Sequence, residues 1–237
     1  MAAAIAGSIH VAGVIDFAEA EMLVGCGVTY LGFPLVLDHH KEDLTIDAAA
    51  AIVSKLRDRA TFFLITYLNK VRDIVALCDA LSVEMVQLHG QTDVEEIARL
   101  RQDAPQLKII KSLIVRDGNA GSLIEEVERY GASVDWFITD TFDPATGASG
   151  ATGKVHDWEV SRRLVALSAK PVILAGGLND GNVRRAIRVV RPAGVDVHTG
   201  LEGRDGRKRR DLTLRFIAEA RAGFVEIGQE SKSGDRA

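Results

Sequence analysis

Short apolar runs rich in β-branched residues alternate with amphipathic stretches eight times along this chain of 237 residues. The runs cover residues 9–14, 28–36, 61–68, 85–89, 107–115, 134–141, 171–175 and 194–199. The stretches have apolar residues at helical spacing and cover residues 17–24, 47–57, 72–81, 94–100, 122–130, 160–168, 182–190 and 212–222. The runs lack polar alternation, which is typical of strands buried on both faces of a parallel sheet. Eight such units in a chain of this length predict a single-domain α/β protein, the (β/α)8 TIM barrel.

An open, doubly wound sheet is the alternative fold. That fold usually carries a glycine fingerprint after its first strand, and at this place the sequence has Gly13 alone. We expect the barrel to cover residues 1–226 and a polar, frayed C-terminal tail to cover residues 227–237.

The composition argues against several other classes of protein. The net charge of −4 is unlike that of a dedicated nucleic-acid binder. The apolar runs are far shorter than the roughly 20 residues needed to cross a bilayer, and the N-terminus lacks the charge and length of a secretion signal. Two cysteines cannot build a disulfide scaffold, which favours a reducing compartment. We therefore expect a cytoplasmic protein without nucleic-acid or membrane partners.

Glycine-rich segments follow the last two runs of the expected barrel. The seventh run ends in Gly176 and Gly177, and the eighth is followed by Gly200 after Thr199. Glycines let the backbone approach a ligand closely, and the loops after strands seven and eight are the usual phosphate site of a TIM barrel. The alternative is that these glycines merely form tight turns. The basic run at residues 204–210 either steers an anionic substrate or is a solvated loop.

Four further segments carry a resemblance to a known family. They are VQLHG at residues 86–90, GATGK at 150–154 followed by Asp157 and Trp158, PVILAGGLN at 171–179, and GVDV at 194–197 extending to Glu202. Together they resemble phosphoribosylanthranilate isomerase, a TIM-barrel enzyme of tryptophan biosynthesis. The resemblance implies an Amadori rearrangement, in which an aminoaldose phosphate opens, loses its C2 proton and becomes an aminoketose. That reaction needs a general acid for ring opening and a general base for the C2 proton.

The resemblance places the general acid at Asp140, in the segment FITDT. The family's base is a cysteine at the end of the first strand. In this chain that position is Ala12, and His10 occupies the family's lysine position. Because alanine cannot accept a proton, the base must be another residue if the chain is an active enzyme.

Two further places depart from the family pattern. The loop that is basic in the family reads LDHHKED at residues 37–43, and His198 with Thr199 replaces serines. We interpret the chain as a divergent sugar-phosphate isomerase or epimerase that acts by acid/base proton transfer on another phosphorylated substrate. Three alternatives stay open: a genuine phosphoribosylanthranilate isomerase with a relocated base, a non-catalytic barrel that binds a phosphorylated ligand, and a metal-assisted aldolase or epimerase.

Most of the six histidines lie at or near expected strand ends. Because side chains alternate along a strand, we expect His10, His89, Asp140, Asp196 and His198 to point into the barrel, with His39 or His40 above them. His198 and His10 are the candidates for the base, since an imidazole titrates near neutral pH. The alternatives are a His/Asp metal site and purely structural histidines.

The predicted site combines these residues, and we assign neither a metal nor a cofactor to it. Lys111, inside the fifth run, could face the barrel interior, where it would form an ion pair or a Schiff base. We expect a small phosphorylated sugar as the partner and a monomer or homodimer as the assembly. The catalytic candidates are Asp140, His198 and His10, and the candidates for binding the substrate and its phosphate are Gly153, Gly176, Gly177, Thr199, Gly200, Gln87, His89 and Asp196.

Overall fold

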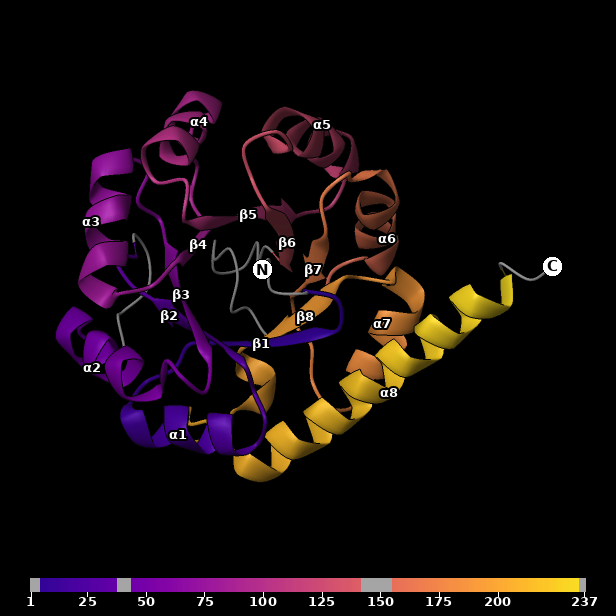
Figure 1. Cartoon of the computed structure of the whole chain (residues 1–237). Helices are drawn as coiled ribbons and strands as arrows, with labels where there is room; N and C mark the ends of the chain where they lie inside the picture. The colour runs from indigo at the N-terminus through magenta and orange to yellow at the C-terminus, as the bar shows by residue number, and fades with distance from the viewer. Residues whose placement is uncertain (1–4, 38–43, 142–154, 235–237) are drawn as a thin grey trace.

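Eight parallel strands close into a barrel with the helices on its outside (Figure 1). The computed structural model describes residues 5–37, 44–141 and 155–234, and side chains as far as residue 230. Neighbouring strands pair in chain order, and β8 (Gly194–Val197) closes the barrel against β1 (Ser8–Ala12). The (β/α)8 TIM barrel predicted from the repeat is therefore confirmed, and the open sheet is wrong.

The remaining elements follow the predicted alternation, so the C-terminal end of every strand lies at the same rim of the barrel. The other strands are β2 (Tyr30–Pro34), β3 (Thr61–Thr66), β4 (Met85–Leu88), β5 (Lys108–Val115), β6 (Trp136–Thr141) and β7 (Val172–Leu174). The helices are α1 (Phe17–Gly25), α2 (Ile46–Leu56), α3 (Val71–Leu81), α4 (Val94–Asp103), α5 (Ala120–Tyr130), α6 (Trp158–Leu167), α7 (Val183–Val190) and α8 (Arg210–Gly234), and a short 3₁₀ helix, η1 (Thr199–Leu201), follows β8.

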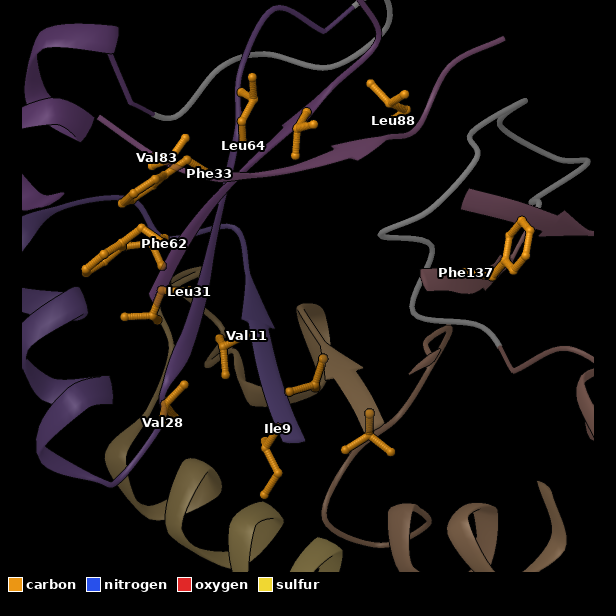
Figure 2. Packing of buried hydrophobic residues seen from close by; sticks show 14 of the residues in the cluster. Ile9, Val11, Val28, Leu31, Phe33, Phe62, Leu64, Val83, Leu88 and Phe137 are labelled. Atoms are coloured by element: carbon orange, nitrogen blue, oxygen red, sulfur yellow. The ribbon is translucent and has the colours of Figure 1, made fainter. Parts of the chain in front are cut away.

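The larger of two apolar cores lies between the barrel wall and the helices. Figure 2 shows part of it, with Val11 of β1, Phe33 of β2 and Leu64 of β3 among its buried side chains. These residues occupy every second position of their strands, because successive side chains point to opposite faces. The helices contribute their apolar faces to the same core, which explains why the strands read as continuous apolar runs.

The smaller core fills the inside of the barrel. Its members occupy the alternate positions of the same strands and include Ala12, Tyr30, Phe63, Ile110 and Trp136. The alternation therefore directs the even-numbered residues of β1, β6 and β8 inward. This parity decides which polar side chains can reach the mouth of the barrel.

The C-terminal segment differs from the prediction. Helix α8 continues to Gly234, so the segment expected to be frayed from residue 227 onward is helical as far as that residue. Ile227 of this segment packs against the core, and ion pairs add weaker contacts, because Glu226 contacts Arg184 of α7 and Glu230 contacts Arg191 directly after it. Figure 1 shows this part of α8 running past α7 and away from the barrel. The division into a barrel and a tail stays a prediction.

The helices were also compared with the length and hydropathy that a membrane span requires. Within the residues that the structure describes, no helix is both long enough and apolar enough to cross a bilayer.

Candidate active site

Two carboxyl groups point into the barrel near its C-terminal rim, as the alternation predicts, one buried (Asp196) and one half-buried (Asp140). Asp196 lies on β8, and Asp140 lies on β6, directly beside Thr141. Burial, and then the negative charge of Asp140, raise the pKa of Asp196 well above its usual range, against the opposing charge of Lys208. Burial also raises the pKa of Asp140, against the charge of His89 and a hydrogen bond from the Thr141 amide. Both carboxyl groups are thereby shifted toward the protonated form that a general acid requires.

Gln87 and His89 form a fixed polar pair at the end of β4. Gln87 Nε2 donates a hydrogen bond to Ser112 Oγ at 3.1 Å, and His89 Nδ1 lies 3.1 Å from the same oxygen. The edge of the His89 ring meets Tyr67 at 5.0 Å between ring centroids. These contacts hold both side chains at the barrel mouth, where Gln87 and His89 were predicted to bind substrate. That role stays a prediction.

His10 lies inside the barrel and below its mouth. Its ring is fully buried, stacks on Tyr30 at 4.5 Å and contacts Phe63. Its Nε2 lies 2.9 Å from Ser8 Oγ. Burial lowers the pKa of His10 to about 3, so the ring is neutral at physiological pH. The structure therefore places His10 inward, as expected, but in a position that suits packing better than proton transfer.

His198 lies where β8 meets the end of β1. Gly13 has a φ of +73°, and a Cβ built there would stand 2.0 Å from His198 Nε2. The imidazole thus covers the backbone of Gly13, the residue directly after Ala12. His198 Nε2 lies 3.4 Å from Glu202 Oε1, and 26% of the His198 side chain is exposed. A partly exposed imidazole that faces a carboxylate, at the end of β1, is well placed to accept a proton.

The glycine loops adopt backbone conformations and close approaches that require glycine. Gly176 and Gly177 adopt φ values of +99° and +62°, and a Cβ on Gly200 would lie 1.9 Å from the Leu178 carbonyl oxygen. The side chain of Asn182 donates to the Gly177 carbonyl at 2.9 Å and so holds the first loop in place. Loops of this kind can present backbone N–H groups to an anion.

Thr199 and Gly200 lie in η1, next to the loop that follows β7. Phosphate binding by Thr199, Gly200, Gly176 and Gly177 stays a prediction. Gly153, His39 and His40 lie outside the described residues.

Two lysines differ from their sequence interpretation. Lys111 faces the helix layer, since its neighbours Ile110 and Ser112 point inward, and its Nζ donates to the carbonyls of Leu88, Gly90 and Ser112. The predicted inward orientation was wrong, because the run is apolar on both sides and its parity cannot be read from it. Lys208 belongs to the basic run, but its side chain is completely buried beside Glu19.

Sequence reasoning also missed His156, at the start of α6. Its Nδ1 lies 2.9 Å from Thr141 Oγ1, and its Nε2 lies 2.6 Å from Ser161 Oγ. A Cβ on Gly176 would meet Thr141 Oγ1 at 2.2 Å and His156 Nδ1 at 2.9 Å. His156 therefore packs against Gly176 in the loop after β7. Burial lowers its pKa to about 4.

The metal alternative receives no support from the described part of the chain. No group of three or more His, Cys, Asp or Glu side chains is arranged there to hold a metal ion.

Comparison with known proteins now connects this geometry to a family. The sequence model of N-(5'-phosphoribosyl)anthranilate (PRA) isomerase matches residues 35–219. N-(5'-Phosphoribosyl)anthranilate isomerase 2 of Methanosarcina mazei is 36% identical over 222 residues, which cover 92% of this chain and 96% of that relative. The chain belongs to the N-(5'-phosphoribosyl)anthranilate isomerase family.

Solved structures of phosphoribosylanthranilate isomerases share the fold. The Thermotoga maritima enzyme is 26% identical with a TM-score of 0.77, and the match covers 91% of this chain and 98% of that one. A complex of phosphoribosylanthranilate isomerase with reduced 1-(o-carboxyphenylamino)-1-deoxyribulose 5-phosphate is 24% identical with a TM-score of 0.75, over 91% and 98% of the two chains. These likenesses give no sign of a divergent paralogue with another substrate. They favour the isomerase of tryptophan biosynthesis, which the sequence analysis held as an alternative, over its main interpretation.

Proposed function

We propose that this chain isomerises N-(5'-phosphoribosyl)anthranilate, with Asp140 as general acid and His198 as general base. The observation that carries the proposal is the position of His198. Its imidazole lies against Gly13, beside Ala12, and the family resemblance places the catalytic base at that position. An imidazole from β8 thereby supplies the proton acceptor that the methyl group of Ala12 cannot supply.

The reaction is balanced within the substrate. Asp140 gives its proton to the ring oxygen as the C1–O bond breaks, which leaves an iminium group at C1. His198 takes the proton from C2, and the electrons of that C–H bond form the C1–C2 double bond of an enolamine. A proton returns to C1 and the C2 hydroxyl loses its proton, so the aminoketose forms without gain or loss of atoms.

The electrostatics support the role of Asp140. Burial raises the pKa of Asp140, which favours the protonated carboxyl group that ring opening needs. The positive φ values at Gly176 and Gly177, with Gly200 packed against the Leu178 carbonyl, support phosphate binding by the loops after β7 and β8. A non-catalytic barrel that binds the same phosphate is the second candidate, and Ala12 is the residue that favours it.

Turnover of the substrate separates the two candidates. The substrate is made in situ from anthranilate and phosphoribosyl pyrophosphate, and its isomerisation is followed by the loss of fluorescence. We expect the wild type to turn over. We expect Asp140→Asn and His198→Ala each to lower kcat by about 10²- to 10⁴-fold, because each removes one proton-transfer group.

Asp79→Asn, at an exposed position of α3, is the matched control and should keep full activity. Folded wild-type protein without turnover would contradict the proposed reaction and favour the binding barrel. Turnover that survives in Asp140→Asn or His198→Ala would contradict the role given to that residue.

A further inference from the structure

We propose that Glu202 is a positioning residue for His198, and that the buried Lys208–Glu19 pair holds Glu202 in place. The inference rests on the proposed function, because it concerns how His198 is prepared to act as the base. Four groups from three parts of the chain take part: His198 after β8, Glu202 after η1, Lys208 before α8, and Glu19 of α1.

Glu202 stands between an imidazole and an ammonium group. One of its oxygens, Oε1, lies 3.4 Å from His198 Nε2 and 3.7 Å from Lys208 Nζ. The backbones of Glu202 and Lys208 also form an antiparallel bridge. The position of the carboxylate is therefore set by main-chain pairing as well as by charge.

Lys208 binds to α1 and to the loop before it. Its side chain is completely buried, as is 99% of that of Glu19, and Lys208 Nζ lies 3.8 Å from Glu19 Oε2. The same ammonium group donates to the carbonyl of Gly13. Glu19 also accepts hydrogen bonds from the amides of Lys208 at 2.8 Å and Ile15 at 3.2 Å. A buried ammonium is tolerated only with such partners, so this cluster joins the loop before α1 firmly to the loop before α8.

A second, exposed ion pair joins the same two loops. Arg207 contacts Asp16, and Asp16 also caps α1 by accepting a hydrogen bond from the Glu19 amide at 2.8 Å. The loop around residues 204–210 is therefore more than a solvated segment, and steering of an anionic substrate by its exposed arginines stays a prediction. Its Lys208 belongs to the structure that surrounds His198.

The chemical consequence concerns the orientation and charge of the His198 ring. The nitrogen that lies against Gly13, Nε2, is also the one that faces Glu202, so the carboxylate fixes how the imidazole lies at the end of β1. When the ring takes the substrate proton, its positive charge is balanced by Glu202.

Two variants of Glu202 separate its charge from its hydrogen-bonding capacity. Glu202→Gln keeps an oxygen acceptor and removes the charge, whereas Glu202→Met removes both. Asp205→Asn is the matched control, because Asp205 is an exposed carboxylate on the same loop. The measurements are kcat and KM, the pH dependence of kcat/KM, and the NMR titration of the His198 ring.

We expect both Glu202 variants to lower kcat by about 10- to 100-fold, less than the loss of the base itself, with KM changed less than about twofold. The acidic limb of the pH profile and the midpoint of the His198 titration should move to lower pH, because the imidazolium loses its counter-charge. Asp205→Asn should match the wild type in every measurement.

The NMR result decides the inference independently of turnover. An unchanged titration midpoint of His198 in both Glu202 variants would overturn it, even if the wild type isomerises the substrate. If the wild type does not turn over but the midpoint moves as expected, the proposed function fails and the positioning of His198 by Glu202 stands.

Discussion

Because Gly13 has no side chain, the imidazole of His198 can lie at the end of β1. A Cβ there would lie 2.0 Å from Nε2, 2.5 Å from Cε1 and 2.6 Å from Cδ2 of His198. Real Cβ atoms do not approach other atoms so closely, so His198 can occupy this place only beside glycine. The position of the proposed base, His198, therefore depends on the absence of a Cβ at residue 13.

Gly13→Ala is expected to displace His198 and to lower kcat by about 10- to 100-fold, because the base moves off its position. Gly7→Ala is the matched control. Gly7 has a φ of +75°, close to the +73° of Gly13, but its added Cβ would come no nearer than 3.8 Å to Phe224. Both variants should lose about 1–2 kcal/mol of folding free energy from the strained backbone, measured by urea unfolding. Equal losses of activity in the two variants would show that backbone strain, not His198, is responsible.

Helix α8 packs against the rest of the protein chiefly through α7. Gly223 lets the two helices approach closely, since a Cβ there would meet Ile187 Cβ at 3.1 Å and the Arg184 carbonyl oxygen at 3.3 Å. Beyond this point Phe224 and Ile227 still pack against the core, and ion pairs lie on the exposed side, with Arg188 Nε 3.6 Å from Glu226 Oε2. Exposed ion pairs of this kind contribute at most about 1 kcal/mol each. The end of α8 is therefore the part of the helix whose stability depends most on its own sequence.

Gly223 and Gly228 test whether the stability of the end of α8 depends mainly on its own sequence rather than on packing against α7. At Gly228 an added Cβ meets nothing within 4 Å, so Gly228→Ala should stabilise the protein by about 0.5–1 kcal/mol through helix propensity. Gly223→Ala gains the same propensity but pushes against α7, and its gain should be smaller or negative. Thermal unfolding of the two variants measures the difference. An equal gain at both positions would mean that α7 and α8 are not closely packed at Gly223.

For the whole molecule, the buried carboxyl group of Asp196 opposes stability at neutral pH. Burial raises the pKa of Asp196 well above its ordinary value, so the unfolded chain releases this proton at a lower pH than the folded protein does. The free energy of unfolding therefore falls as the pH rises from the ordinary carboxyl pKa, about 3.9, toward the folded value. Functional sites commonly oppose stability in this way.

Asp196→Asn removes this titration, and the variant should become increasingly more stable than the wild type as the pH rises above about 4. Asp135 gives a control of opposite sign. Its pKa is lowered, because hydrogen bonds from the Ile109 amide and Arg101 outweigh burial. Asp135→Asn should therefore be less stable than the wild type at neutral pH, and the deficit should shrink only as the pH falls below about 4. Urea midpoints between pH 2 and 8 test both variants, and parallel curves for all three proteins would contradict both expectations.

Much of this architecture could be predicted from the sequence alone, because it depends on the spacing of apolar residues within single strands and helices. The alternation of apolar runs and amphipathic stretches predicted the barrel, since both periods arise from the geometry of one strand or one helix. The same parity placed His10, His89, Asp140 and Asp196 inside. The motifs from Met85 onward indicated the family, and its general acid was matched to Asp140 from the same pattern.

The surroundings of His198 were decided by tertiary structure. Glu19 and Lys208 are separated by 189 positions in the chain, and the sequence shows Lys208 only as one member of a basic run. Its burial arises because closing β8 against β1 brings the loop before α8 onto α1. The orientation of Lys111 and the support of Gly176 by His156 likewise depend on which chain segments pack together. Local periods specify elements and their faces, whereas burial and charge pairing across distant loops exist only after the barrel has closed.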